Sequence, residues 1–219
     1  MTLFNGTAGC ALAAHAASKA AALALWEMGA NVTAIADGKR PMHVWDAWQE
    51  ERQSLEVVNG IQWNGRKSYH GSKPIPPAQT VGIIGGIGGW RCLDIDALVD
   101  AQGEKQPVPE SVVLAVLYAF GLSADYPWYG RSRSGAGWHV WFRCDDDLPD
   151  ALAAASKSSK GESGVKVGTP ASAYAGLFDH LELRWERCQT VLPSPDGYTG
   201  VLPDEPPALV NIDQVAAAF

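Results

Sequence analysis

The 219-residue chain has few cysteines, and their spacing excludes the common zinc-binding patterns. There are four, with no CxxC pair and no Cys/His spacing typical of a zinc site. Scattered thiols are typical of proteins from a reducing compartment, so we expect reduced cysteines and a cytoplasmic location. The four are Cys10, Cys92, Cys144 and Cys188.

Long hydrophobic runs are missing as well. The Ala-rich stretch 11–25 is interrupted by His15 and Lys19, and alanine contributes little to membrane insertion. The stretch also lacks the basic start of a signal peptide. We therefore expect no membrane partner.

Basic charge is scarce, because 17 lysines and arginines stand against 24 aspartates and glutamates, for a net charge of −7. This balance argues against a protein that coats nucleic acid by bulk charge, although a local basic groove is compatible with it. Hydrophobic residues make up 47% of the chain, which is enough for the core of one large domain or two small ones.

Hydrophobic periodicity and turn residues predict a mixed α and β chain. Thr7 is the expected cap of the first helix and Gly29 its expected stop. Trp45 and Trp48 are spaced for one face of a second helix. We expect helices at 7–28, 44–58, 110–120 and 150–157, and strands at 31–36, 80–84, 90–96, 126–131, 138–143, 180–185 and 188–193. Polar or Pro/Gly-rich loops are expected at 62–77, 97–109 and 158–170.

A run of glycines at 85–89 separates two of the expected strands. The run does not complete GxGxxG, lacks the GK[ST] of a P-loop, and leads into a strand rather than a helix. We therefore reject a nucleotide-binding loop. A tight β-hairpin turn between the strands at 80–84 and 90–96 is the better interpretation.

Two aspartates, Asp94 and Asp96, end the apolar strand at 90–96. Residues i and i+2 of a strand point to the same face, so both carboxylates aim at one point while Ile95 turns into the core. Like charges this close favour a cation between them, and a hard divalent ion, Mg²⁺ or Mn²⁺, is the natural partner. A strand end running into a polar turn is the simpler alternative.

A basic, glycine-containing turn at 131–137 leads into the strand that carries His139. The turn suits an anion, because it offers backbone amides, the Ser134 hydroxyl and two arginines, Arg131 and Arg133. We interpret the turn and His139 as a candidate phosphate site, with a structural histidine as the alternative. The turn at 37–41, which carries two cations, is interpreted as solvated on its residues alone, with a phosphate contact at the end of a strand as the alternative.

A third acid lies on a late strand. In the strand expected at 180–185, leucines face inward and alternate with Glu182 and Arg184. Glu182 and Arg184 therefore share the outer face of that strand.

Taken in order, these motifs resemble the archaeo-eukaryotic primase superfamily, and within it the primase–polymerase (prim-pol) domain of plasmid and phage replication proteins. The resemblance covers about residues 20–200. It is carried by Gly-Lys-Arg-Pro at 38–41, Gly-Ile-Ile-Gly at 82–85, Leu-Asp-Ile-Asp at 93–96, Ser-Gly-Ala-Gly-Trp-His at 134–139, Leu-Glu-Leu-Arg at 181–184 and Thr-Val-Leu-Pro-Ser at 190–194.

The resemblance implies an α+β archaeo-eukaryotic primase fold. In that fold an N-terminal αβ unit packs on an RRM-like sheet, with the active site in the cleft between them. Residues 1–200 would form the catalytic domain. Residues 201–219 would be a C-terminal linker or tail, which a further domain could follow in a longer protein.

The resemblance also implies the roles of the site residues. Asp94, Asp96 and Glu182 would be the catalytic acids and would hold two Mg²⁺ or Mn²⁺ ions. The nucleotide-binding residues would be His139, Ser134, Arg133, Gly135, Lys39 and Arg184. One departure concerns the second motif, which is often Ser-x-His in the family, whereas Gly137 stands at that position here. Either a backbone amide replaces the hydroxyl or Ser134 curls back.

The implied activity is a DNA primase/polymerase, which joins nucleotides from NTP or dNTP on a single-stranded DNA template. This phosphoryl transfer needs a two-ion site, for which three carboxylates are the minimum. A helicase domain or protein is a further partner that the resemblance allows. Two alternatives stay open: a metal-dependent nuclease that uses the same acids, and a non-catalytic DNA-binding or initiator module.

Overall fold

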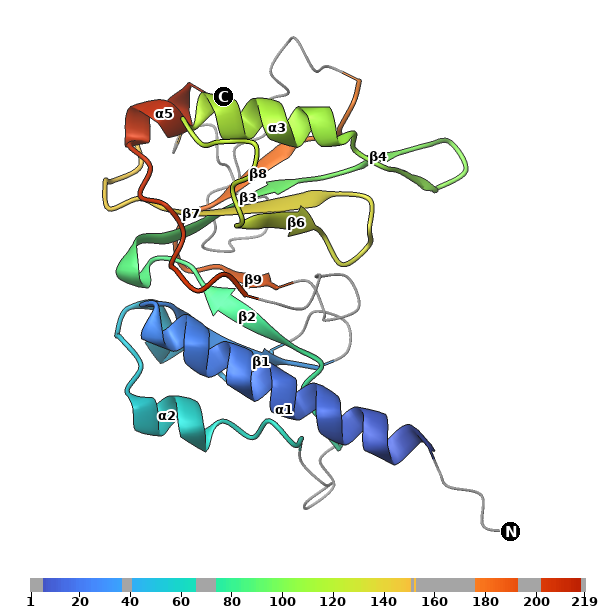
Figure 1. The fold of residues 1–219 in the computed structure, drawn as a ribbon, viewed down its shortest axis with the longest axis vertical. Coiled ribbons are helices and arrows are strands. Elements are labelled where there is room, and N and C mark those ends of the chain that lie inside the picture. Colours follow the sequence, from blue (N-terminus) through green and yellow to red (C-terminus); the bar gives the residue numbers. More distant parts are fainter. Residues whose placement is uncertain are drawn as a thin grey trace.

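The computed structural model describes residues 6–36, 41–65, 74–150, 152, 176–192 and 202–217. Two larger antiparallel sheets lie one above the other, with helices on their outer sides (Figure 1). Three sequence predictions lie wholly or largely outside the described residues: the helix at 150–157, the loop at 158–170 and the basic turn that holds Lys39. The mixed α and β composition is confirmed.

The first helix, α1 (Gly6–Glu27), packs against the lower sheet. It begins at Gly6, so Thr7 lies inside the helix and is not its cap. Gly29 ends it as predicted, with a φ of +97° and an N–H that donates to the Trp26 carbonyl over 2.9 Å. Within the described residues, no helix has the length and apolar character needed to cross a membrane.

The lower sheet has the order β1-β2-β9, and all its pairs are antiparallel. Its strands are β1 (Asn31–Ile35), β2 (Thr80–Ile84) and β9 (Gln189–Val191). Every residue of β1 and β2 is buried, and α1 packs against both strands. This sheet confirms three strands predicted from the sequence.

A group of polar side chains, Asn31, Arg52 and Gln53, covers the outer edge of β1 and is called the edge cluster below. The Gln53 amide accepts from the backbone N–H of Val32 (2.7 Å) and donates to its carbonyl (2.8 Å). Asn31 accepts from the Arg52 guanidinium over 2.9 Å. Side-chain amides thus satisfy backbone groups that a further strand would otherwise pair.

The prediction of a single helix at 44–58 is wrong. Asn31 donates to two carbonyls of this segment, each over 2.7 Å, and so diverts groups that a continuous helix would use internally. Ser54 then starts a new helix by accepting from the N–H of Val57. The structure has two short helices here, η2 (Asp46–Gln49) and α2 (Leu55–Gly60).

The upper sheet has the order β6-β7-β3-β8, again fully antiparallel. Its strands are β6 (Tyr129–Arg131), β7 (Trp138–Arg143), β3 (Trp90–Ile95) and β8 (Leu181–Arg184). β3 is central, and its residue Asp94 lies opposite His139 of β7 and Glu182 of β8. β6 is shorter than the strand predicted at 126–131.

Helix α3 (Glu110–Ala119) covers one face of the upper sheet. The rings of Phe120, at its end, and Phe142 of β7 meet edge to face, with centroids 5.0 Å apart. Leu93 and Ile95 are fully buried. Because side chains alternate along β3, Asp94 points to the opposite face, as the sequence predicted.

The hairpin predicted at the glycine run is wrong, because β2 and β3 belong to different sheets. The run instead forms a short 3-10 turn, η3 (Ile87–Gly89), that carries the chain from one sheet to the other. A Cβ on Gly88 would lie 2.5 Å from the carbonyl oxygen of Gly29, and one on Gly89 would lie 2.4 Å from an Asp145 oxygen. Gly88 thus approaches the backbone of Gly29 closely, and the φ of +66° at Gly88 and +71° at Gly89 also favours glycine.

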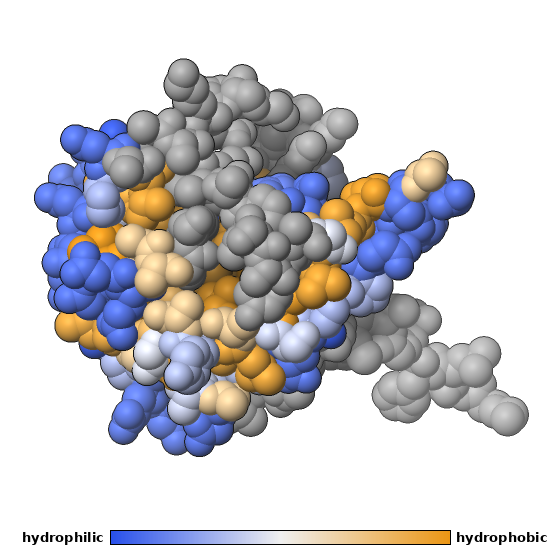
Figure 2. All heavy atoms as spheres, turned by 90° about the horizontal axis from the view of Figure 1, so that it is seen from above, coloured by the Kyte–Doolittle hydropathy of each residue, from blue (hydrophilic) through white to orange (hydrophobic). Residues whose placement is uncertain are grey.

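The connection predicted at 97–109 contains a small hairpin, which projects from the domain (Figures 1 and 2). The Asp100 carboxylate accepts from the N–H groups of Gln102 (3.0 Å) and Glu104 (2.8 Å), which closes the turn. Its residues are mostly hydrophilic in Figure 2. The two strands are β4 (Leu98–Val99) and β5 (Lys105–Gln106).

The C-terminal segment 202–217 packs back on the upper half. The Val210 N–H donates to the Arg143 carbonyl at the end of β7 over 2.7 Å. Helix α5 (Ile212–Ala216) follows, capped by Asn211, and buries Val215 completely. The segment 202–217 is therefore packed against the domain.

Candidate active site

The candidate site is a cross-strand row on the face of the upper sheet that α3 leaves uncovered. Asp94, His139 and Glu182 stand opposite one another on three adjacent strands. His139 Nε2 lies 3.4 Å from Asp94 Oδ1, and both side chains are largely buried. The antiparallel register therefore brings together residues from three distant parts of the sequence.

Arg184 holds Glu182 in place. Its guanidinium forms an ion pair with the Glu182 carboxylate and also donates to the Thr190 hydroxyl (2.7 Å) and the Gln189 carbonyl (3.0 Å) of β9. Burial is the largest single influence on Arg184 and opposes its charge. The surrounding groups, Glu182 foremost and then Cys188, Asp94 and Cys92, together outweigh burial, so the pKa of Arg184 is raised. Arg184 is a fixed cation that joins the two sheets.

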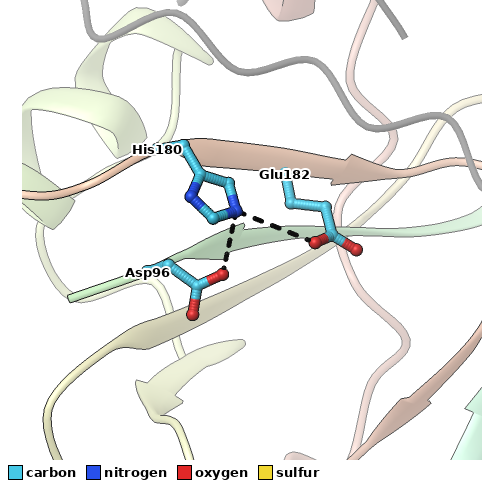
Figure 3. A group of neighbouring side chains, drawn as sticks. All are labelled: Asp96, His180 and Glu182. Carbon is cyan, nitrogen blue, oxygen red and sulfur yellow. Dashed lines mark ion pairs between the residues drawn. The ribbon is translucent and has the colours of Figure 1, made fainter. Parts of the chain in front are cut away.

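Asp96 lies just past the end of β3 and meets a histidine to which the sequence analysis gave no role. His180 Nε2 lies 3.1 Å from Asp96 Oδ2 and 4.0 Å from Glu182 Oε2 (Figure 3). His180 Nδ1 lies 2.8 Å from Asp179 Oδ2. The sequence signal was present, since His180 precedes Glu182 by two residues and so shares its face.

The six side chains of this region are called the acid cluster below: Asp94, Asp96, His139, His180, Glu182 and Arg184. Asp96, His180 and Glu182 offer one ligand atom each within 4.8 Å of one another. Asp94 continues the same face but lies against His139. Carboxylate oxygens with one imidazole fit a divalent ion such as Mg²⁺ or Mn²⁺. The exposed fractions of Asp96 (35%) and His180 (39%) leave that point open to substrate.

The Ser/Gly turn before β7 is held by a serine that the sequence analysis missed. Ser132 Oγ accepts from the Gly137 N–H (3.2 Å) and lies 3.1 Å from Ser134 Oγ. A Cβ on Gly137 would lie 2.5 Å from the carbonyl oxygen of Ile95. Gly137 thus stands at the departure from Ser-x-His because β7 passes close to the end of β3. Gly135 has a φ of +75° and faces open space.

The two arginines of this turn diverge. Arg131 stacks on Trp138, 3.8 Å from the ring centroid, and donates to the Val108 carbonyl over 2.9 Å, so it lies on the α3 side, away from the acids. Arg133 donates to the Gln79 side chain ahead of β2 over 3.2 Å. Of the other predicted nucleotide ligands, Lys39 lies outside the described residues.

His139 has one nitrogen in contact with Asp94 and one without a hydrogen-bond partner among the described residues. Its Nδ1 is buried and makes no hydrogen bond within the described part of the chain. A buried nitrogen without a hydrogen bond is costly. It is therefore a polar atom of the site that a bound ligand or a water can satisfy.

Two buried thiols lie beside the acid cluster. Burial, together with the Asp94 charge, raises the pKa of Cys92 well above its ordinary value. Burial also raises the pKa of Cys188 to about 11. Both are therefore protonated at neutral pH, which makes them poor nucleophiles and metal ligands.

Acids from two strands and a histidine from a third, converging on one face of an antiparallel sheet, are consistent with an α+β primase domain. The chain belongs to the Prim-Pol family, described as bifunctional DNA primase/polymerase, N-terminal, whose family model matches residues 22–209. No curated protein matches the chain. The sequence-based recognition is thus confirmed, and the chain has a primase/polymerase-family role in DNA replication, acting on DNA and nucleotides. Enzymes of this family typically depend on divalent metal ions.

Proposed function

We propose that this chain is a DNA-directed nucleotidyltransferase that makes primers on single-stranded DNA and extends them. In each step a 3′-hydroxyl oxygen bonds to the α-phosphorus of a nucleoside triphosphate, pyrophosphate leaves, and the hydroxyl proton is lost to solvent. The observation that carries the proposal is the row Asp94–His139–Glu182, with Asp96 at its open end.

Asp94, Asp96 and Glu182 would hold the divalent ions, as the resemblance implied. Bound Mg²⁺ or Mn²⁺ would lower the pKa of the attacking hydroxyl and neutralise charge on the leaving pyrophosphate. The fit rests on the oxygen and nitrogen atoms that lie within 4.8 Å of one another at the end of β3.

The remaining residues of the site would bind and position the nucleotide. His139 offers a buried nitrogen that makes no hydrogen bond to the described part of the chain, and the Ser134–Gly135 turn offers amides next to Arg133 for the triphosphate. Arg184 keeps Glu182 oriented through its bonds to β9. Lys39 stays a predicted supporting cation.

The experiment that tests the proposal measures incorporation of labelled nucleotides with Mg²⁺ or Mn²⁺, on single-stranded DNA with and without an annealed primer. Metal-dependent synthesis is expected, and products without a primer would show primase activity. Asp96→Ala should abolish synthesis. Asp147→Ala is the matched control, because Asp147 is an exposed aspartate outside the acid cluster, and it should synthesise at the wild-type rate.

Equal synthesis by Asp96→Ala and the wild type would overturn the proposal. Metal-dependent cleavage of DNA without nucleotide incorporation would instead support the nuclease, which membership of this family does not favour. DNA binding without any nucleotide binding would support the non-catalytic module. Titrating each ligand separately distinguishes these outcomes.

His139→Ala tests the nucleotide site. Loss of the imidazole should weaken nucleotide binding about tenfold or more and leave DNA binding nearly unchanged, since His139 is buried among the acids. An equal loss for both ligands would contradict its predicted role.

A further inference from the structure

We propose that His180 is itself a ligand, through Nε2, of the metal ion that Asp96 and Glu182 would hold. Asp179 would be the carboxylate that orients it. This inference rests on the proposed function only in that it needs the metal site. It adds a nitrogen donor to a set that the sequence analysis limited to three carboxylates.

The backbone fixes His180 beside Asp96. The N–H of Asp96 donates to the His180 carbonyl over 3.0 Å, and the N–H of Asp179 donates to the Asp96 carbonyl over 2.9 Å. β8 begins at the next residue and carries Glu182 on the same face. The imidazole is therefore placed between the two carboxylates by the strand register, as Figure 3 shows.

The distances suit a shared ion. Two ligands of one Mg²⁺ lie at most about 4.2 Å apart, which is twice the usual metal–oxygen distance. His180 Nε2 lies 3.1 Å from Asp96 Oδ2 and 4.0 Å from Glu182 Oε2. All three ligand atoms lie within 4.8 Å of one another, so a side-chain shift of a few tenths of an ångström is enough.

The second nitrogen of the imidazole has the partner that metal-bound histidines usually have. His180 Nδ1 lies 2.8 Å from Asp179 Oδ2, and a proton on Nδ1 directs the lone pair of Nε2 at Asp96 and Glu182. With the proton on Nδ1, the Nε2 lone pair faces two carboxylates, and a cation between them would satisfy all three groups. A carboxylate–histidine–metal arrangement supplies one.

His139 offers a comparison within the same site. Its Nε2 contacts Asp94, but its Nδ1 has no hydrogen-bond partner within the described residues, so no carboxylate orients its ring. The orienting carboxylate is present at His180 and missing at His139. We therefore assign the metal to His180 rather than to His139.

A nitrogen donor alters the preference for the ion. Mg²⁺ favours oxygen ligands and retains its waters, whereas imidazole suits transition ions better. His180 would therefore raise the affinity for Mn²⁺ more than that for Mg²⁺.

The direct test is pulsed electron paramagnetic resonance of Mn²⁺ added to the full chain, without DNA or nucleotide. The wild type is expected to show a ¹⁴N coupling from a bound imidazole. His180→Ala should lose this coupling. His139→Ala is the matched control, because it removes the other imidazole of the acid cluster and should keep the coupling.

Metal-binding titrations measure how much each side chain contributes to the affinity for the ion. His180→Ala should weaken Mn²⁺ binding about tenfold or more, and Asp179→Asn should weaken it by about tenfold, the usual cost of losing an orienting partner. The affinity for Mg²⁺ should fall by less than about threefold in either variant. Circular dichroism of each variant checks that the fold is retained.

Two results would overturn the inference. Saturable Mn²⁺ binding without ¹⁴N coupling in the wild type would show an all-oxygen site, and metal-dependent synthesis would then still support the proposed function. A coupling that survives His180→Ala and disappears in His139→Ala would place the imidazole ligand on β7. A wild type that binds Mn²⁺ with the ¹⁴N coupling but incorporates no nucleotide would contradict the proposed function and leave the inference about His180 standing.

Discussion

The edge cluster and the acid cluster are both groups of polar side chains with buried members, but they differ in what these members bind. In the edge cluster, Asn31 and Gln53 bind mainly backbone groups, through neutral amides. In the acid cluster, carboxylates, imidazoles and a guanidinium face one another, and His139 Nδ1 has no hydrogen bond within the described residues.

This difference separates a structural role from a functional one. Neutral amides that match the hydrogen-bonding pattern of a strand edge stabilise the fold without storing charge. Facing carboxylates cost stability, because like charges opposite one another repel, and proteins retain them where chemistry needs them. The predictions below test this contrast.

The largest effect is expected for Asp94→Asn. The change keeps the shape of the side chain and removes a charge opposite Glu182. Synthesis should fall on the order of 10³-fold, which corresponds to about 4 kcal/mol. The free energy of unfolding should stay the same or rise, because a repulsion is lost. Single-turnover incorporation and urea denaturation measure the two quantities; a protein that is much less stable would contradict the contrast.

Asn31→Ala should have the opposite effect to Asp94→Asn: it should lower stability and leave synthesis nearly unchanged. It removes the donor to two backbone carbonyls and the acceptor of the buried Gln53 N–H. The free energy of unfolding should fall by about 3 kcal/mol, because backbone groups lose their partners. Urea denaturation measures the loss, and synthesis by the remaining folded protein should stay within about twofold of the wild type. A selective loss of synthesis would show that the edge cluster also serves the site.

Gly137→Ala tests how closely β7 must approach β3. The new Cβ would lie 2.5 Å from the Ile95 carbonyl oxygen, so the strands must separate, at a cost of about 2 kcal/mol. Gly135→Ala is the matched control in the same turn, since its Cβ meets open space and only its φ of +75° is unfavourable. It should cost about 1 kcal/mol. Equal losses in urea denaturation would contradict the close approach.

The smallest effect is expected for Cys188, which lies beside Arg184 and Glu182. Burial raises its pKa to about 11, so the unfolded chain loses this proton at a lower pH than the folded chain. Stability should therefore fall as pH rises from about 9 to 11. Cys188→Ala should remove about 1 kcal/mol of that fall at pH 10. Urea denaturation of the wild type and of Cys188→Ala at pH 8 and pH 10 gives the fall in stability for each protein. An equal fall in both would contradict the raised pKa of Cys188.

Local patterns predicted most of the elements of the fold. Alternation placed Asp94, Ile95, Glu182 and Arg184 on their correct faces, because the side-chain period of a strand depends only on its own residues. Gly29 ended the first helix for an equally local reason, a backbone conformation that glycine adopts easily. The ordered motifs also carried the resemblance that the family match confirmed.

The errors came from contacts between distant segments. The helix predicted at 44–58 is divided because Asn31, from β1, binds two of its carbonyls. The glycine run was interpreted as a hairpin, yet it carries the chain from one sheet to the other, and its close neighbours are Gly29 and Asp145. Neither partner can be recognised from the residues of the segment itself.

By itself, the sequence determined which residues carry charge, which face of each strand they occupy and which family the chain belongs to. Only the tertiary structure decided which of these residues meet. His180 joins Asp96 because the register of β3 against β8 pairs segments about 85 positions apart in the sequence. Arg184 likewise holds Glu182 because β9 of the other sheet accepts its remaining hydrogen bonds. Register and sheet packing depend on the whole core, so no local pattern contains them.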